Sequence, residues 1–302
     1  DVFVKASPNG TLFSYSAYLE AIGRDVGLWY CVQGEQVKAA FACVETAPGV
    51  SYLDDLVVYN GIMFQPPEPD QNVSQVRSEQ FKVAEFTAKE LLKHYSRLEV
   101  QFHPTVVDAR PWLWVNYGKG WWHAHYNVGV RYTSHYHPGL YGNERDRGQA
   151  MSQSRRQQIR YAQRDGVRVV EAFEPQLFMA WYERTVETTA AFRARLKRLL
   201  HHLQHKGLTR WFGAYTTLPE WELRSIAVFG VDNKRAYWLW GLSDPEKRDT
   251  PCGTEVVWEG MIRLANDGVG MIDLEGVNSP KRGWFKLSFG GTLEPYWQVR
   301  LT

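Results

Sequence analysis

The sequence has few cysteines and no long apolar run. Its three cysteines, Cys31, Cys43 and Cys252, are too few and too scattered for a disulfide framework or a paired-cysteine zinc site. The longest apolar stretches, such as residues 226–231, fall far short of the roughly 20 residues that cross a bilayer, so no membrane insertion is expected. The first residues, DVFVKASPNG, show no signal-peptide pattern. A reducing, cytoplasmic location is therefore expected.

Four catalytic motifs are also missing. The sequence contains no GxxxxGK[ST] phosphate loop, no GxGxxG dinucleotide fingerprint, no HExxH zinc helix and no GxSxG nucleophile elbow. Most nucleotide hydrolases, dinucleotide oxidoreductases, zinc proteases and α/β-hydrolases are thereby disfavoured.

Composition places the chain among folded globular proteins. Its 302 residues suggest two domains or one large one, and 44% hydrophobic with 23% charged residues is ordinary for a folded chain. The 13 Trp and 16 Tyr residues fit either a large core or aromatic walls around a site.

Charge is unevenly distributed along the chain. The net charge of +2 argues against broad, nonspecific coating of nucleic acid. Residues 145–210, however, contain 14 Lys and Arg against 6 Asp and Glu, a net +8, which leaves −6 for the rest.

The first half alternates helix and strand signals. A short helix is expected over residues 14–22. Two strand-like runs, 28–32 and 37–44, predict a hairpin. Asn72 can cap a long helix over residues 73–95. Further strands are expected over residues 51–61, 98–102, 112–117 and 127–132.

The second half repeats much of this order. A Ser-capped helix is expected over residues 154–164, a strand over 167–171, a helical region over 175–206 and a further strand over 211–215. A second hairpin (224–231 with 236–242), a helix (254–266) and a last strand (269–274) follow. Each half thus contains a hairpin, a loop, a helix and a strand. This predicts an internal duplication of an α/β unit, with domains 1–150 and 151–302 that meet within residues 142–151.

The most informative segment is MIDLEGVNSPKRGWFKLSFGG. A strand delivers Asp273, a glycine-containing turn follows, and Lys286 then stands among aromatic residues. Such a lysine can reach into a partly dry site while its stem packs on aromatic rings. The alternative is a surface lysine on an edge strand.

This segment resembles the C-terminal signature of the Fem-type aminoacyltransferases and their wider acyltransferase superfamily. In that signature, a strand with Asp is followed by Gly-Val or Gly-Ile and then by Phe-Lys-x-x-Phe-Gly-Gly. The matching residues are Asp273, Gly276, Val277, Phe285, Lys286, Phe289, Gly290 and Gly291. A second segment is similar to the family's Ser/Arg-rich helix through Arg156, Ile159, Arg160, Ala162, Gly166 and Val167. The pair Trp258-Glu259 is a weaker third match.

The resemblance implies an α/β (α+β) fold of two tandem GNAT-like domains, each a mixed sheet flanked by helices. This agrees with the duplication described above. Relatives in cell-wall synthesis carry a helical-hairpin arm in the second domain. The region 175–206 is too short for such an arm, so we expect none, which weakens an assignment to the classical peptidoglycan bridge enzymes.

The implied chemistry is N-acylation, in which an amine attacks an activated carbonyl. A lysine ammonium can stabilise the charge that builds on the carbonyl oxygen, and the resemblance puts Lys286 at the donor end of the substrate channel, with Phe285 beside it in substrate binding. Asp273 is expected to orient or deprotonate the amine, or else to cap a turn. No Ser or Cys nucleophile with an evident base is visible in the sequence, which favours direct transfer over a covalent acyl-enzyme.

Four arginines share the helix expected over residues 154–164. Arg156, Arg160 and Arg164 are spaced by four residues and so lie on one face, which can grip phosphate or can simply be solvated. The resemblance favours phosphate, because relatives use an arginine in this region on the acceptor's diphosphate. The substrate-binding residues are therefore expected to include Arg155, Arg156, Arg160, Trp258 and Glu259.

The stretch RARLKRLLHHLQHK, residues 193–206, is basic and amphipathic. Its cations are candidate contacts to the backbone of a tRNA, namely Arg193, Arg195, Lys197 and Arg198. The alternative is a solvated helix face opposite Leu196, Leu199, Leu200 and Leu203.

Two histidine pairs, His123 with His125 and His135 with His137, would each lie on one face of a strand. A metal could be held there. Because no carboxylate or cysteine shares the spacing and the superfamily needs no metal, neither a metal nor a cofactor is expected.

The choice of donor depends on the loop before residue 254. GNAT acetyltransferases hold the pyrophosphate of CoA with an Arg/Gln-x-x-Gly-x-Gly/Ala loop at a helix N-terminus, and EKRDTPCGTE lacks that pattern. Gly253 and the free N–H groups of the helix could still bind an anion. The donor is expected to be aminoacyl-tRNA, with acyl-CoA as the alternative. The acceptor is expected to be a small amine, such as a peptidoglycan precursor, an amino sugar or a natural-product amine, and the protein a monomer. A non-catalytic RNA- or glycan-binding module is the remaining hypothesis.

Overall fold

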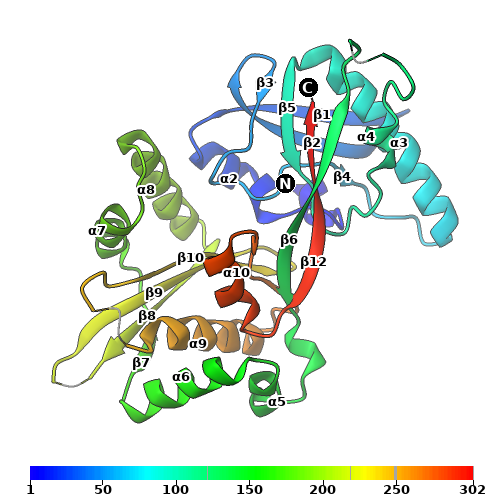
Figure 1. Cartoon of the computed structure of the whole chain (residues 1–302). Coiled ribbons are helices and arrows are strands. Elements are labelled where there is room, and N and C mark those ends of the chain that lie inside the picture. Colours follow the sequence, from blue (N-terminus) through cyan, green and yellow to red (C-terminus); the bar gives the residue numbers. More distant parts are fainter. Residues whose placement is uncertain (121, 218, 248–249, 302) are drawn as a thin grey trace. The chain divides into compact units, whose positions relative to one another are not determined.

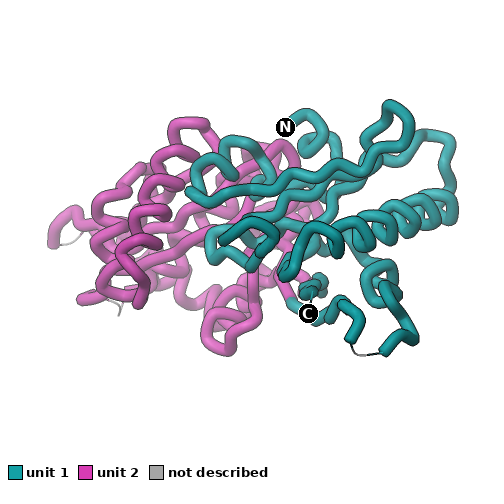
Figure 2. The backbone as a smooth tube through the Cα atoms, turned by 90° about the horizontal axis from the view of Figure 1, so that it is seen from above, with its two compact units in different colours: residues 1–131, 295–302 teal, residues 132–294 magenta. Residues whose placement is uncertain are grey.

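The computed structural model describes residues 1–302 except 121, 218, 248–249 and 302. The chain forms two compact units, unit 1 with residues 1–131 and 295–302 and unit 2 with residues 132–294 (Figure 2). It passes from one unit to the other within β6 (Tyr126–Tyr136) and again within β12 (Thr292–Leu301).

The boundary predicted at residues 142–151 lies inside unit 2. The polar stretch there forms a short helix, α5 (Glu144–Gln149), rather than a linker. Asn143 caps this helix by accepting a hydrogen bond from the N–H of Asp146 at 3.0 Å. The compact units therefore differ from the predicted halves, 1–150 and 151–302, and residues 295–302 pack with unit 1.

Unit 1 is built on a mixed sheet in which hydrogen-bonded neighbours follow the order β1, β2, β3, β5, β12, with β4 paired to β2. The strands are β1 (Asp25–Gln33), β2 (Gln36–Ala47), β3 (Val50–Ser51), β4 (Met63–Phe64) and β5 (Arg97–Gln101). The helices are α1 (Val2–Ala6), η1 (Leu12–Ser14), α2 (Ser16–Ala21), α3 (Val73–His94) and α4 (Arg110–Leu113).

The core of unit 1 lies between α3 and the sheet. Asn72 caps α3 through a capping box with Gln75, as the sequence predicted for the cap residue. The strand expected over residues 112–117 is wrong, because residues 110–113 form α4. Trp112 is fully buried and its ring lies 5.2 Å from that of Phe102, so tertiary packing rather than strand alternation explains the apolar run.

Unit 2 is built on a second run of paired strands, in the order β6, β11, β10, β9, β8, β7. The strands are β7 (Arg168–Glu171), β8 (Thr209–Thr216), β9 (Glu222–Val231), β10 (Ala236–Ser243) and β11 (Ile272–Asp273). The helices are η2 (Pro138–Leu140), α5, α6 (Gln153–Arg164), α7 (Pro175–Thr185), α8 (Ala190–His205), α9 (Cys252–Asn266) and α10 (Pro280–Leu287).

Helices cover both faces of the sheet in unit 2 (Figure 1). On one face α9 packs against β8 and β9 and contacts α6, and Phe212 of β8 joins this core. On the other face α7 and α8 contact each other and the sheet, where Trp211 lies 5.4 Å from Phe178. The region 175–206 thus forms two ordinary packed helices, and the expectation of no long arm is confirmed.

The same order of elements occurs in both units. Unit 1 has the hairpin β1–β2, the helix α3 and the strand β5, and unit 2 has the hairpin β9–β10, the helix α9 and the strand β11. The predicted α/β architecture, with one order of elements occurring twice, is therefore confirmed. Within the described residues, no helix has the length and apolar character needed to span a bilayer.

Candidate functional site

Lys286 lies on α10, so the edge-strand alternative is wrong. Pro280 occupies the first turn of this helix, where its missing N–H costs nothing. The helix approaches the preceding turn so closely that a Cβ added to Gly283 would lie 2.4 Å from the carbonyl oxygen of Val277. Gly283 thus fixes the distance between α10 and the segment that follows Asp273.

The side chain of Lys286 is half-buried among aromatic rings. Its Nζ lies 5.4 Å from the ring centroid of Trp238 on β10. The rings of Trp238, Phe285 and Phe289 pack together, with centroid separations of 5.3–6.0 Å. Burial lowers the pKa of Lys286, while the carboxyls of Glu275 and Asp273 act in the opposite direction. The ammonium therefore sits in a poorly solvated place beside two acidic groups.

Asp273 is the last residue of β11 and is fully buried. Its Oδ1 accepts hydrogen bonds from the hydroxyl of Thr133 at 2.5 Å and from the N–H of Glu275 at 2.7 Å. Its Oδ2 lies 3.4 Å from Nε2 of His135. Accepting the N–H of the second residue along is the geometry of a turn cap, as in the alternative weighed for Asp273, and a direct part in the reaction stays a prediction.

Phe285 is held by Arg155. The guanidinium of Arg155 lies 4.5 Å from the ring centroid of Phe285, and its Nη1 donates to Oε1 of Gln158 at 2.5 Å and to the hydroxyl of Thr254 at 2.7 Å. Burial lowers the pKa of this guanidinium. Arg155 thus joins α6, α9 and α10, and it positions Phe285.

The two other arginines assigned to substrate binding on α6 differ in their surroundings. Nη1 of Arg156 donates to the carbonyl oxygens of Met151 at 2.7 Å and Gln149 at 3.1 Å. Arg160 is exposed, and Arg164 pairs with Asp165 at 2.8 Å. Arg156 therefore connects α6 to the preceding segment. Arg160 is exposed, and no carboxylate pairs with it among the described contacts.

Trp258 and Glu259 follow each other on α9 but have different roles. Trp258 is buried in the core of unit 2, with its ring 6.5 Å from that of Tyr136. Glu259 is half-buried and pairs with Arg263 at 2.9 Å, one turn further along. Both contribute to the packing of α9, and their part in substrate binding stays a prediction.

The basic stretch forms α8, whose apolar face is buried as an amphipathic helix requires. Arg193 donates to the carbonyl oxygen of Thr188 at 2.5 Å and pairs with Glu183 at 3.1 Å, whereas Lys197 and Arg198 are exposed. The remaining candidate, Arg195, is half-buried.

The histidines lie in two places along the chain. His135 and His137 are on or next to β6, with ring centroids 6.1 Å apart, and His135 faces Asp273. His123 and His125 precede β6, in the segment of the chain that belongs to unit 1. In the described part of the chain, no group of three or more His, Cys, Asp or Glu side chains is arranged to hold a metal ion.

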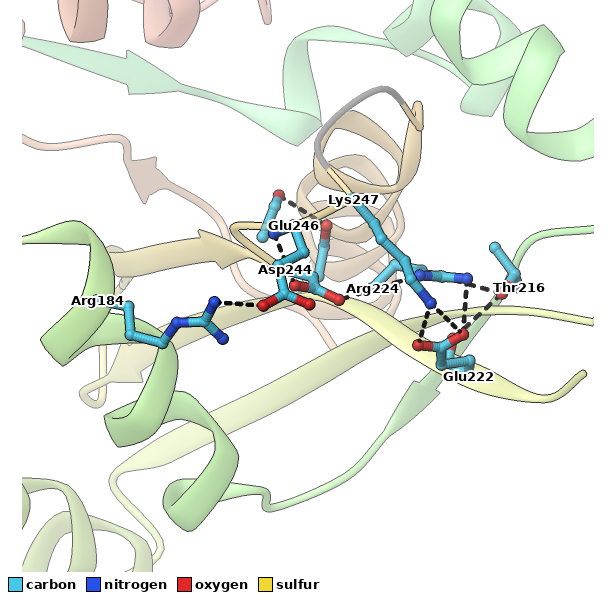
Figure 3. Close-up of polar contacts among 9 residues, drawn as sticks. Arg184, Thr216, Glu222, Arg224, Asp244, Glu246 and Lys247 are labelled. Atoms are coloured by element: carbon cyan, nitrogen blue, oxygen red, sulfur yellow. Dashed lines mark hydrogen bonds and ion pairs between the residues drawn. The ribbon is translucent and has the colours of Figure 1, made fainter.

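The loop before α9 is bordered by ion pairs (Figure 3). Arg224 on β9 and Lys247 in the loop both pair with Glu222, at 2.7 and 2.8 Å. Arg184 on α7 pairs with Glu246 at 2.5 Å. Arg224 also lies 3.9 Å from Asp244, so each of these three cations already has a carboxylate partner. Two residues of the loop motif, Arg248 and Asp249, lie outside the described residues.

Unit 1 contains a cavity of about 540 Å³ between α3 and the segment around α4. Its lining is mostly apolar and includes Phe81, Ala84, Val106, Pro111, Val128 and Trp297. Arg110 at this cavity pairs with Asp108 at 2.6 Å. None of the lining residues belongs to the site predicted from the sequence.

Comparison with known proteins rests on structure, since no family model and no curated protein matches the sequence. The structure of FemX is 14% identical, covers 98% of this chain and 94% of its own, and has a TM-score of 0.65. A tandem GNAT protein from the clavulanic acid biosynthesis pathway is 10% identical, with 99% and 92% covered and a TM-score of 0.55. L-PGS from Bacillus licheniformis is 9% identical, with 99% and 89% covered and a TM-score of 0.51.

These similarities extend over nearly the whole chain. The chain has a tandem GNAT-like fold of the Fem type. The fold resemblance inferred from FKLSFGG and the arginine-rich helix is thus confirmed, although the identities of 9–14% are too low to carry an activity.

Two buried carboxyls in the second GNAT-like part were missed by sequence reasoning. Glu275 is 7% exposed, and its φ of 59° is the left-handed backbone conformation that favours glycine. Glu255, in the first turn of α9, is 6% exposed, and burial raises its pKa to about 7. The signal for Glu275 was present in DLEG, where two acidic residues two positions apart end a buried strand.

Proposed function

We propose that the protein transfers an aminoacyl group directly from aminoacyl-tRNA to an amine and so forms an amide bond. The observation that carries this proposal is the position of Lys286, with its ammonium over Trp238 and in the electrostatic field of Glu275 and Asp273. The tandem GNAT-like fold supports it as an architecture, and the chemistry rests on this group of residues.

Lys286 stabilises the oxygen on which negative charge develops. When the amine attacks the ester carbonyl, the tetrahedral intermediate carries an oxyanion, and a cation in a poorly solvated site stabilises that charge more than it would in water. The ring of Trp238, which packs against Phe285 and Phe289, lies beside the ammonium and reduces its contact with water. Asp273 accepts a hydrogen bond from the N–H of Glu275, and so it fixes the turn that follows β11 and orients Glu275.

Aminoacyl-tRNA is the donor that we favour. The loop before α9 lacks the pattern that binds the pyrophosphate of CoA, and Arg184, Arg224 and Lys247 beside it are already paired with carboxylates. A pyrophosphate would have to displace these pairs. Lys197 and Arg198 on α8 are exposed and are proposed to contact the phosphates of the tRNA.

The acceptor is proposed to be a small amine that carries phosphate. The exposed guanidinium of Arg160 on α6 is the group best placed to bind that phosphate. Arg155 acts on the same site by holding Phe285.

An acyl-CoA-dependent N-acyltransferase is the second candidate. The observation that favours it is the start of α9, a helix of 15 residues, where a Cβ added to Gly253 would lie 3.0 and 3.7 Å from the hydroxyl oxygens of Ser243 and Ser225. Helix N-termini of this kind bind phosphate groups.

The test supplies the purified protein with a pool of charged tRNAs and, separately, with acetyl-CoA and longer acyl-CoAs. Each donor is combined with alkylamines, amino sugars and phosphate-bearing amines, and amide product and donor consumption are followed. We expect amide formation with the charged tRNAs. Product from an acyl-CoA alone would select the second candidate, and binding of RNA or glycan with neither donor consumed would leave a binding module.

A further inference from the structure

Glu275 combines two unfavourable features in one residue. Its carboxyl is buried, and among the described residues no hydrogen-bond donor reaches Oε1. Its backbone has a φ of 59°, which costs free energy for any residue with a Cβ. A buried carboxyl oxygen without a hydrogen-bond donor is also unfavourable. Because both features cost free energy of folding, their presence in one residue suggests that the residue has a function.

The backbone around Glu275 is held rigidly. The N–H of Glu275 donates to Oδ1 of Asp273 at 2.7 Å. On either side, the N–H of Leu274 donates to the carbonyl oxygen of Ser134 at 2.8 Å, and the N–H of Val277 donates to that of Tyr132 at 3.1 Å. Strand β6 therefore supports the turn along its length, and the strained conformation persists because these bonds fix it.

Charged and titratable groups on β6, β11 and α10 surround Glu275. Burial raises the pKa of Glu275 to about 8, Asp273 on β11 acts in the same direction, and Lys286 on α10 acts against both. Arg282 on α10 acts in turn on Lys286, and His135 on β6 faces Asp273. Burial lowers the pKa of Lys286. An acid with a raised pKa and a base with a lowered pKa thus share one poorly solvated place.

We propose that Glu275 is the general base that removes a proton from the attacking amine, an inference that rests on the proposed function. It is supported by the burial of the carboxyl beside Lys286, by its unbonded Oε1 and by the rigid turn that presents it. Asp273 is less suited to this task, because it is fully buried and engaged with Thr133, His135 and the N–H of Glu275.

The proposed step balances without any further reactant. The amine nitrogen forms a bond to the carbonyl carbon of the activated ester, and the carbonyl electrons move onto the oxygen beside Lys286. The nitrogen, which is now positively charged, gives one proton to the carboxylate of Glu275. The intermediate then collapses, the bond from carbon to the leaving oxygen breaks, and that oxygen takes the proton from Glu275. The products are an amide and a free hydroxyl, and Glu275 returns to its ionised form.

Two substitutions separate this role from a structural one. Glu275→Gln keeps the shape and removes the base, and we expect turnover to fall by about 10²–10⁴-fold with folding retained. Glu275→Gly removes the carboxyl and relieves the left-handed backbone, and we expect the Tm to rise by about 2–4 °C while turnover is lost. A residue kept only for the fold would instead lose stability in both variants.

The experiment measures single-turnover transfer from the charged tRNA pool and from acetyl-CoA to an alkylamine, for the wild type, Glu275→Gln, Glu275→Gly and the exposed control Glu187→Gln. The same reactions are run with a phosphate-bearing amine. If the wild type transfers from the charged tRNA pool to neither amine, the proposed function fails, whatever Glu275 does. If the wild type transfers and Glu275→Gln retains turnover within about threefold, Glu275 is not the base, and acyl transfer by Lys286 stands. Deprotonation of the amine raises the rate of both proteins with pH; we expect the wild type to show a further rise as Glu275 ionises, and Glu275→Gln to lack that further rise.

A second readout does not depend on activity. Infrared difference spectroscopy of the full chain near pH 7 should show the band of a protonated carboxyl in the wild type that is absent from Glu275→Gln and present in Glu187→Gln. Loss of this band on raising the pH would support the raised proton affinity of Glu275. A band that is absent from Glu275→Gln but persists in the wild type at every pH would mean that the carboxyl never ionises and so cannot accept a proton, which would overturn the proposal.

Discussion

The ammonium of Lys286 and the indole of Trp238 form a cation–π pair in unit 2, with Nζ 5.4 Å from the ring centroid. The two residues come from α10 and β10, which are separated by nearly 50 positions along the chain. This pair brings the FKLSFGG segment onto the sheet, and it makes Lys286 the first residue to test.

Replacement of Lys286 by Met keeps the apolar stem and removes the charge. We expect turnover to fall by about 10²–10³-fold, because one donor to the oxyanion is lost, and the Tm to change by only a few degrees. Lys286→Arg should restore little, since a planar guanidinium does not replace a compact ammonium. Single-turnover transfer at matched folding is the measurement, with Lys281→Met, exposed on the same helix, as the control. Retention of turnover within about threefold by Lys286→Met would make the lysine structural.

Arg156 and Arg160 should separate stability from acceptor binding. Arg156→Ala removes hydrogen bonds to the carbonyl oxygens of Met151 and Gln149, and we expect a loss of about 1.5–3 kcal/mol in the free energy of unfolding. Arg160→Ala, at an exposed position, should change stability by less than about 0.5 kcal/mol.

The same variants test phosphate recognition. If the acceptor carries a phosphate that α6 binds, the KM for the acceptor should rise about tenfold or more in Arg160→Ala. If Arg156 also contacts the phosphate, the KM for the acceptor should rise more in Arg156→Ala than in Arg193→Ala. Urea denaturation and acceptor titration are the measurements. An unchanged KM in both α6 variants would mean that this face is only solvated.

Glu255 should make the protein less stable as the pH rises. Burial raises the pKa of Glu255 from 4.5 to about 7, with Glu259 acting in the same direction. Between these values the folded protein holds a proton that the unfolded chain has released, so stability decreases as the pH rises through this window. The full effect is on the order of 3 kcal/mol.

Glu255→Gln keeps the neutral form at every pH. We therefore expect it to match the wild type in urea denaturation at about pH 5 and to be more stable at about pH 8, where the wild type must ionise a buried group. The exposed Glu187→Gln should show no such difference. Equal stability of Glu255→Gln and the wild type at both pH values would contradict the raised pKa of Glu255.

Gly283 should be intolerant of a side chain. A Cβ at this position would lie 2.4 Å from the carbonyl oxygen of Val277, so Gly283→Ala must push α10 away from the turn that contains Glu275. We expect a loss of about 1–3 kcal/mol in stability together with reduced turnover. Gly270→Ala, where nothing lies within 4 Å, is the control, and thermal unfolding with a transfer assay would show whether the two variants differ.

Local signals were sufficient for the long elements of the fold. The helix α3 has Asn72 as its cap and a regular apolar face, and the hairpin β9–β10 has a polar turn between two apolar strands. Both were predicted to within two residues of their observed ends, because caps, turns and periodicity act over a few residues.

The errors came from positions that distant residues decide. Trp112 was assigned to a strand, yet its burial against Phe102 is a property of the folded core. No helix is predicted over residues 280–287 from the sequence, although Ser279 and Pro280 mark the start of α10. A strand was expected there only in the alternative for Lys286. The left-handed backbone of Glu275 depends on hydrogen bonds to β6 and leaves no trace in the local sequence.

The last strand has a consequence for how the chain folds during synthesis. β12 pairs with β5 in the register Leu301↔Leu98 and Gln298↔Gln101, so the sheet of unit 1 lacks a strand until residues 295–302 have been made. Unit 2 needs no residue beyond 294 and can close first. Although proteins usually fold their N-terminal part first as they emerge from the ribosome, here the earlier unit must wait for the later one, and it exposes the edge of β5 to chaperones or to misfolding in the meantime.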